Sequence, residues 1–457
     1  MSGSVSELCG WAAALTPSQL PPDVARAARL QHLGLAGASR RLAPLPSRAA
    51  CGSGPAGELA AFLLYHFDDS LLGGRVSAAA LPLAWAGPSG TTDELIAATV
   101  AANEVAGRVG LAGSLGRGPG EVDVRPLRAG AAVMRARLEH ASAAAMTAAV
   151  EAALESSAPV PLGEVATAAG AARIAGEILG GGGIGGANPA RIEAWGGAGN
   201  VWFTRTLTCP RFPGSPGANV ALDALDVILG RHLKAAEKRL RADQVERVDV
   251  RVSFASAVCA KATEGLTPPA LGAWSLAEAL SLLLVHHELG PEWLESGASG
   301  EKAEEVAALA SRVTITPDWK LSARRLRVLA QALGPVLGPV GVAKLLRSAR
   351  PHLGGELDAD QLVPLFRERP WEALTGLRKR GGLDACDLVS ARCYPAEVKL
   401  YTTRGGWWPE RRNTPTGIAE GLEGAARARF GNEAAAESLL AARGDKPAAE
   451  WIAELRA

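Results

Sequence analysis

Two places in this sequence hold carboxylates whose surroundings suit proton transfer. Asp68 and Asp69 are adjacent and lie at a break between apolar helical segments. Neighbouring carboxylates can separate their pKa values, so that one stays protonated and acts as an acid. Glu278 lies in the otherwise apolar segment WSLAEALSLLL, where burial would raise the pKa of its carboxyl group and favour acid–base catalysis. The structural alternatives are a helix cap for the aspartate pair and an exposed helix position for Glu278.

Basic side chains close to these carboxylates could hold an anionic substrate. Arg75 follows the aspartate pair and offers a permanent, bidentate anion clamp, although it cannot act as a base near neutral pH. Arg205 and Arg211 flank a proline-broken segment and could bind an acidic group, or they could be solvated loop charges. His66 is the histidine nearest the aspartates, and is either a proton carrier or a residue on a helix face.

The sequence contains no pattern typical of a metal or nucleotide site. Its seven histidines form no HxH or HExxH arrangement, and its six cysteines form no CxxC pair. The glycine run at 180–186 lacks the following Lys-Ser or Lys-Thr and the preceding strand of a phosphate loop, so it is expected to be a loop between helices. We therefore expect neither metal nor any other cofactor.

Composition narrows the classes of partner. Of the 457 residues, 48% are hydrophobic and 21% charged, which is typical of a globular chain of two or three domains. A net charge of +1 gives no broad positive field for nucleic acid. The apolar runs are shorter than the ~20 residues of a membrane-spanning helix, and the start of the chain lacks the pattern of a signal peptide. We expect a cytoplasmic protein that acts on a small molecule.

Hydrophobic periodicity predicts a mostly α-helical protein with two domains. Helical spacing dominates the first two hundred residues and returns after residue 417. Between them, apolar and polar residues alternate as in strands at residues 245–254, 311–317 and 395–403. The prediction is a large helical domain formed by residues 1–204 and 405–457, and a smaller α+β lid domain formed by 205–404.

Short stretches along nearly the whole chain resemble the MmgE/PrpD family, which includes methylcitrate dehydratase and cis-aconitate decarboxylase. Phe67, Asp68 and Asp69 match an "LDFDD" motif of that family, and Glu104 and Arg108 match its next helix. The other similar stretches are LPPDVARAARLQHLGLAGA, RFPGSPGANVALDAL, GAWSLAEALSLLL, SRVTITPDW and PAEVKLYTTRGG. The resemblance implies an α-helical domain with an α+β lid, a site in the cleft between them, and a homodimer.

The sequence departs from that family at most of its site positions. Arg75 stands where the family has a histidine, Asn219 stands where it has another, and Glu278 replaces a tyrosine. Pro210 replaces a basic lysine, with Arg211 beside it. The activity of the named relatives therefore does not transfer directly. Asp68, Asp69, Glu278 and His66 remain the catalytic candidates, and Arg75, Arg205, Arg211 and Asn219 the substrate-binding candidates.

Two functions follow from these expectations. The first is a cofactor-independent lyase or isomerase that eliminates, decarboxylates, isomerises or cyclises a small organic acid or related metabolite, as in bacterial specialised metabolism. The second is a non-catalytic member of the same fold that binds a ligand or serves as a scaffold. Loss of the family's basic site residues favours the second, whereas the retained aspartates and the unusual Glu278 favour the first.

Overall fold

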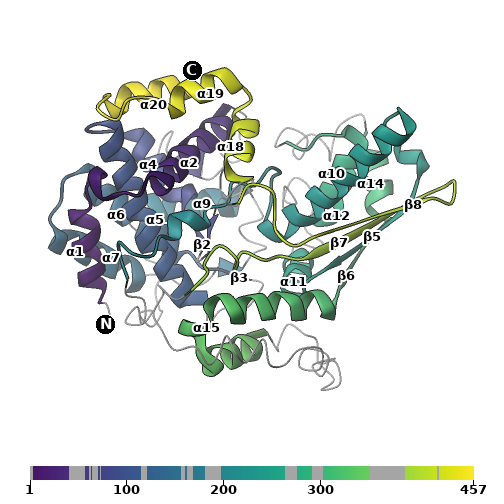
Figure 1. The fold of residues 1–457 in the computed structure, drawn as a ribbon, viewed down its shortest axis with the longest axis horizontal. Coiled ribbons are helices and arrows are strands. Elements are labelled where there is room, and N and C mark those ends of the chain that lie inside the picture. The colour runs from purple at the N-terminus through teal and green to yellow at the C-terminus, as the bar shows by residue number, and fades with distance from the viewer. Residues whose placement is uncertain are drawn as a thin grey trace.

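The computed structural model is mostly helical and contains one four-stranded sheet. It describes residues 4–40, 57–60, 63, 70–72, 74–114, 121–155, 160–161, 168–180, 197–262, 275–290, 302–349, 386–418 and 421–457. Figure 1 shows helices gathered around the two termini and the sheet at the opposite end of the molecule. Within the described ranges, no helix is long and apolar enough to cross a membrane.

Helices form the first part of the chain. The long helix α5 and helix α6 pack on each other, and α4, α7 and α1 pack around them. The elements before the sheet are α1 (Val5–Ala14), η1 (Pro17–Gln19), α2 (Pro22–Arg40), α4 (Ser77–Ala86), α5 (Thr92–Ser114), α6 (Arg125–Leu138), α7 (Ala143–Glu155), α9 (Ala168–Gly180) and η4 (Phe203–Thr206). Two short antiparallel pairs accompany them: β1 (Ser70–Leu71) with β2 (Gly74–Arg75), and β3 (Glu121–Val122) with β4 (Val160–Pro161). The region expected to be all helical therefore includes two small β-ladders.

The sheet has the strand order β6-β5-β7-β8. Strand β5 runs parallel to β6 and antiparallel to β7, which pairs in turn with β8. The elements of this part are α10 (Pro216–Ala236), η5 (Ala242–Gln244), β5 (Val245–Val252), α11 (Phe254–Ala262), α12 (Leu276–His286), α14 (Ala303–Ala310), β6 (Val313–Pro317), α15 (Trp319–Ala349), β7 (Ala396–Thr402) and β8 (Trp407–Arg412). The three strands predicted from alternation are thus β5, β6 and β7.

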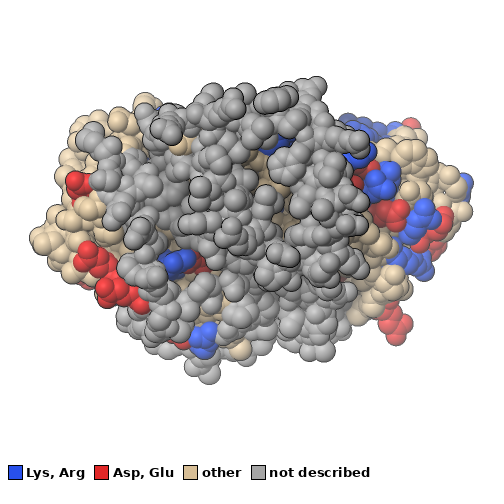
Figure 2. All heavy atoms as spheres, turned by 90° about the horizontal axis from the view of Figure 1, so that it is seen from below, with Lys and Arg blue, Asp and Glu red and all other residues tan. Residues whose placement is uncertain are grey.

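The alternation of β5 explains its position in the sheet. Val248, Val250 and Val252 are buried against α10 and α12, whereas Arg247 and Arg251 point to the other face. Figure 2 shows basic and acidic side chains interleaved at the sheet end of the molecule. A strand that buries one face and exposes the other has alternating apolar and polar residues in its sequence. The fourth strand, β8, was not predicted, and the expected domain boundary at residue 404 is too early because β8 continues the sheet to Arg412.

The last helices return to the first part of the chain. They are α18 (Leu422–Phe430), α19 (Glu433–Leu440) and α20 (Ala448–Arg456), and they share one apolar core with α2 and α5. Helix α18 approaches α2 closely at Gly37, where an added Cβ would lie 2.3 Å from the carbonyl oxygen of Arg429. Only a glycine permits backbones to come this near.

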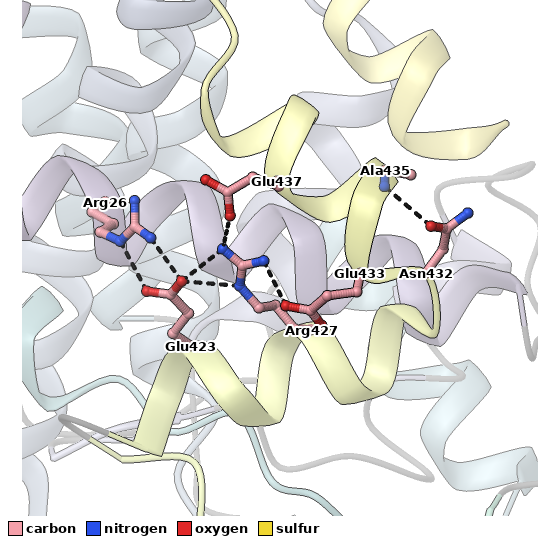
Figure 3. Close-up of polar contacts among 7 residues, drawn as sticks. All are labelled: Arg26, Glu423, Arg427, Asn432, Glu433, Ala435 and Glu437. Atoms are coloured by element: carbon pink, nitrogen blue, oxygen red, sulfur yellow. Dashed lines mark hydrogen bonds and ion pairs between the residues drawn. The ribbon is translucent and has the colours of Figure 1, made fainter.

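An ion-pair network joins α2, α18 and α19. Arg427 binds Glu423 and Glu433, each at 2.8 Å, and also Glu437, while Arg26 binds Glu423 at 2.7 Å (Figure 3). These carboxylates raise the pKa of Arg427. Because the network is partly exposed, it adds little to the free energy of unfolding and mainly fixes how the three helices are oriented.

Candidate functional site

A short hairpin lies where the helices meet the segment that leads to the sheet. Strands β1 and β2 pair Ser70 with Arg75. The Thr208 amide donates to the Ser70 carbonyl oxygen at 2.9 Å, and the Leu72 amide donates to the Thr206 hydroxyl at 2.9 Å. The residues that directly follow the predicted Asp68–Asp69 pair are therefore fixed to the crossing segment between the two parts of the molecule.

Arg392, which precedes β7, holds this hairpin from the sheet side. Its guanidinium donates to the Leu71 carbonyl oxygen at 2.7 Å, to the Ser70 hydroxyl at 2.9 Å and to the Thr208 hydroxyl. The side chain is buried, and its Nε has no hydrogen-bond partner in the part of the chain that the structure describes. A buried guanidinium satisfied by neutral acceptors forms a rigid connection between the hairpin and the sheet.

Three of the four predicted catalytic residues lie outside the part of the chain that the structure describes. They are Asp68, Asp69 and His66. Arg75 is placed only by its backbone in β2. The convergence of these groups with Glu278 on one cleft stays a prediction.

Glu278 lies in the first turn of α12. Its Oε2 is buried and has no hydrogen-bond partner among the described residues, and burial raises the pKa of the carboxyl group. The opposite end of α12, at His287, lies near Arg239 and Leu240, which precede β5. The first turn of α12, which carries Glu278, is therefore the end of the helix away from the start of β5. In open sheets with parallel strands, ligands bind beyond the carboxyl ends of those strands.

Asp223 on α10 is a second buried carboxylate with a raised pKa, again because of burial. Its Oδ2 accepts a hydrogen bond from the Thr416 amide at 2.6 Å, and its Oδ1 has no partner within the described ranges. The two carboxylates differ in access, because Asp223 is only 2% exposed whereas Glu278 is partly open to solvent. Of the two, Glu278 is the one that a substrate could reach.

Both predicted substrate-binding arginines of the crossing segment bind carboxylates within the chain. Arg205 pairs with Asp23 at 2.7 Å, and Arg211 pairs with Asp226 at 2.5 Å. All four side chains are partly exposed, so these are surface ion pairs that can open and form again.

Asn219 is fully buried and bonds to the backbone before its own helix. Its Oδ1 accepts from the Phe212 amide at 2.9 Å, and its Nδ2 donates to the Ser215 carbonyl oxygen at 3.2 Å. These bonds fix the entry of the chain into α10. In this arrangement Asn219 supports the proline-rich segment, and its predicted role in substrate binding would require these bonds to break.

The structure adds a group that the sequence did not suggest. Arg325 on α15, Tyr394 before β7 and Ser253 after β5 come together at the carboxyl end of β5. A basic residue one to two turns after a strand is too common to stand out in a sequence. Only the order of the strands shows that these three segments are neighbours.

The described residues contain no group of three or more His, Cys, Asp or Glu side chains placed to bind a metal ion. What they offer for acid–base chemistry is the carboxyl group of Glu278, whose pKa is raised by burial. No protein-family model matches the chain, and no curated protein matches it either.

Proposed function

We propose that this protein is a cofactor-independent enzyme of the lyase or isomerase type that acts on a small organic acid. The observation that carries the proposal is Glu278 in the first turn of α12, whose buried Oε2 has no hydrogen-bond partner among the described residues and whose pKa is raised by burial. Burying a carboxylate without a partner costs stability, so retaining one calls for a functional reason.

The chemistry would be proton transfer at a carbon next to a carboxylate. A carboxyl group whose pKa lies nearer neutrality exchanges a proton more readily in both directions, which serves elimination, decarboxylation, isomerisation and cyclisation alike. The β1–β2 hairpin, whose backbone includes Arg75, is fixed between the two parts of the molecule by Arg392, which supports a substrate site at their junction. The resemblance to the MmgE/PrpD family supports the same class of reaction and the same location.

The test is hydrogen exchange and turnover in D₂O. The full chain is incubated with a pool of small organic acids, and NMR follows deuterium incorporation and consumption of each acid. We expect Glu278→Gln to lower the rate by about 10²–10⁴-fold, because the amide cannot take the proton. Glu288→Gln, an exposed position just after the same helix, is the matched control and should keep the wild-type rate. Equal rates in both variants would remove Glu278 from the reaction.

A second candidate function is a non-catalytic, ligand-binding scaffold. It is favoured by the internal partners of Arg205, Arg211 and Asn219, which leave these three groups satisfied without substrate. If the wild-type protein neither consumes any acid in the pool nor exchanges its hydrogen for deuterium, the scaffold function is favoured over the enzymatic one.

We also propose that the chain forms a homodimer through its alanine-rich helices, as the family resemblance implies. Light scattering at micromolar concentration should then give about twice the chain mass of 47.0 kDa. A mass near that of one chain contradicts the dimer and leaves the proposed reaction untouched.

A further inference from the structure

Arg325 is a half-buried cation without a carboxylate partner among the described residues. One guanidinium nitrogen donates to the Ser253 hydroxyl at 3.3 Å, and the guanidinium lies over the ring of Tyr394 at 4.6 Å. Asp318, which directly precedes α15, caps the start of this helix by accepting from the Leu321 amide. Arg325 thus keeps donors that no anion in the described structure uses.

The surroundings of Arg325 are polar hydroxyls and further positive charge. Ser253, which is buried, also shares a hydrogen bond with Ser256 at 3.1 Å. Arg392 lies 5.6 Å from the Tyr394 ring, on which Arg325 is also stacked. Two guanidinium groups around one phenol ring make this place electropositive, and hydroxyl groups supply neutral donors beside them.

The fold assembles this group from separate segments. Ser253 and Ser256 follow β5, Arg325 lies on α15 after the parallel strand β6, and Tyr394 precedes β7. Figure 1 shows α11 between the sheet and α15, and contacts of α11 with both confirm this placement. The site therefore lies at the carboxyl ends of β5 and β6.

We propose that Arg325, with Ser256 and Tyr394, forms a subsite that binds a carboxylate group of a small molecule. Arg325 supplies the charge-assisted hydrogen bonds, the Ser256 hydroxyl donates one more, and the stacked Tyr394 ring holds the guanidinium plane in position. The subsite deepens the proposed function and rests on it in one respect: it is the group that would orient the organic acid whose proton Glu278 moves.

Calorimetric titration tests binding separately from turnover. The full chain is titrated with acetate, succinate and citrate at constant ionic strength, and with inorganic phosphate and neutral succinamide for comparison. We expect saturable binding of at least one carboxylate, weakened about tenfold to a hundredfold by Arg325→Gln and less by Arg325→Lys. The matched control is Arg247→Gln, because Arg247 lies over Tyr401 at 3.8 Å at the far end of the same sheet and has Asp249 beside it.

Each result decides the proposal. Equal carboxylate affinity in the wild type and in Arg325→Gln overturns it, as does an equal loss in Arg247→Gln, and so does the absence of saturable carboxylate binding. Binding of phosphate in preference to every carboxylate overturns the assigned ligand class. Carboxylate binding that depends on Arg325 without any proton exchange at the bound acid supports the subsite while it contradicts the enzymatic function.

Discussion

Two glutamates, one in each part of the molecule, are buried in opposite ways. Glu104 on α5 is fully buried, and its carboxylate accepts hydrogen bonds from the Phe203 amide at 2.9 Å, the Thr204 amide at 2.8 Å and Arg108 at 2.8 Å. Glu278 on α12 has a buried oxygen that accepts no hydrogen bond from any residue that the structure describes. Burial alone therefore does not mark a functional carboxylate; burial without compensation does.

The same contrast extends to the arginines. Arg108 forms an ion pair inside the helical core and also donates to the Val201 carbonyl oxygen at 3.0 Å, which fixes the end of the helical part of the chain. Arg325 at the sheet end has a hydroxyl and a ring as its partners. The charged groups of the helical core thus pair with each other and stabilise the fold. At the sheet end, Arg325 and Glu278 have no oppositely charged partner among the described residues.

Removal of the Glu104 charge should have the largest effect on stability. Glu104→Gln leaves Arg108 as a buried charge without a counter-ion, which typically costs about 3–5 kcal/mol. Chemical denaturation followed by circular dichroism measures the loss. The double variant Glu104→Gln/Arg108→Met removes both charges and should lose clearly less. A single-variant loss below about 1 kcal/mol would contradict the structural role given to this pair.

His32 should make the helical core sensitive to acid. It is fully buried, its Nδ1 accepts from the Trp85 indole at 3.0 Å, and its Nε2 therefore donates to the Thr99 hydroxyl at 2.9 Å. Burial, and to a lesser degree Arg29, lowers its pKa from 6.5 to about 3. The stabilisation is complete above the unfolded pKa of 6.5 and is lost as pH falls from there towards the folded value, because only the unfolded chain takes up the proton.

Between pH 7 and pH 5 this linkage should lower the free energy of unfolding by ~2 kcal/mol. Denaturation midpoints across that range measure the slope. His32→Gln should be less stable at pH 7 and show a flatter slope, whereas His140→Gln, at an exposed position, should keep the wild-type slope. An unchanged slope in His32→Gln would mean that another group dominates the acid response.

The fold class and three strands could be predicted because each depends on local periodicity. Alternation in β5 and β7 reflects one buried face, as Val248 and Val398 show. Strand β8 escaped prediction because its sequence WWPERR has no apolar alternation: its residues are exposed or half-buried at the edge of the sheet. Pro409 is compatible with an edge position, where an amide hydrogen bond is not required.

The candidate site was predictable only in part, because its members depend on tertiary pairing. Glu278 stands out in sequence, since a charge among leucines contradicts the local pattern. Arg325 and Tyr394 do not differ from the pattern of their neighbours in the sequence. They come together only because β5 lies between β6 and β7. Conversely, Asn219 was proposed from the resemblance alone, and its bonds to the Phe212 amide and the Ser215 carbonyl oxygen could not be read from sequence.

The smallest expected effect is also the one that separates the two glutamates most directly. Burial raises the pKa of Glu278 in the folded chain, so its protonated form is favoured there. Below the unfolded pKa of 4.5 the carboxyl group is neutral and its burial lowers the free energy of unfolding only slightly. Stability is then lost as pH rises through the folded pKa.

Glu278→Gln removes that ionisation and should therefore stabilise the protein at pH 7, by less than about 1 kcal/mol, and have no effect near pH 4. Glu104→Gln should destabilise at pH 7, so the two substitutions have opposite signs in the same denaturation experiment. Destabilisation by Glu278→Gln at pH 7 would show that its carboxylate is held by a partner, and the contrast between the two parts of the molecule would then fail.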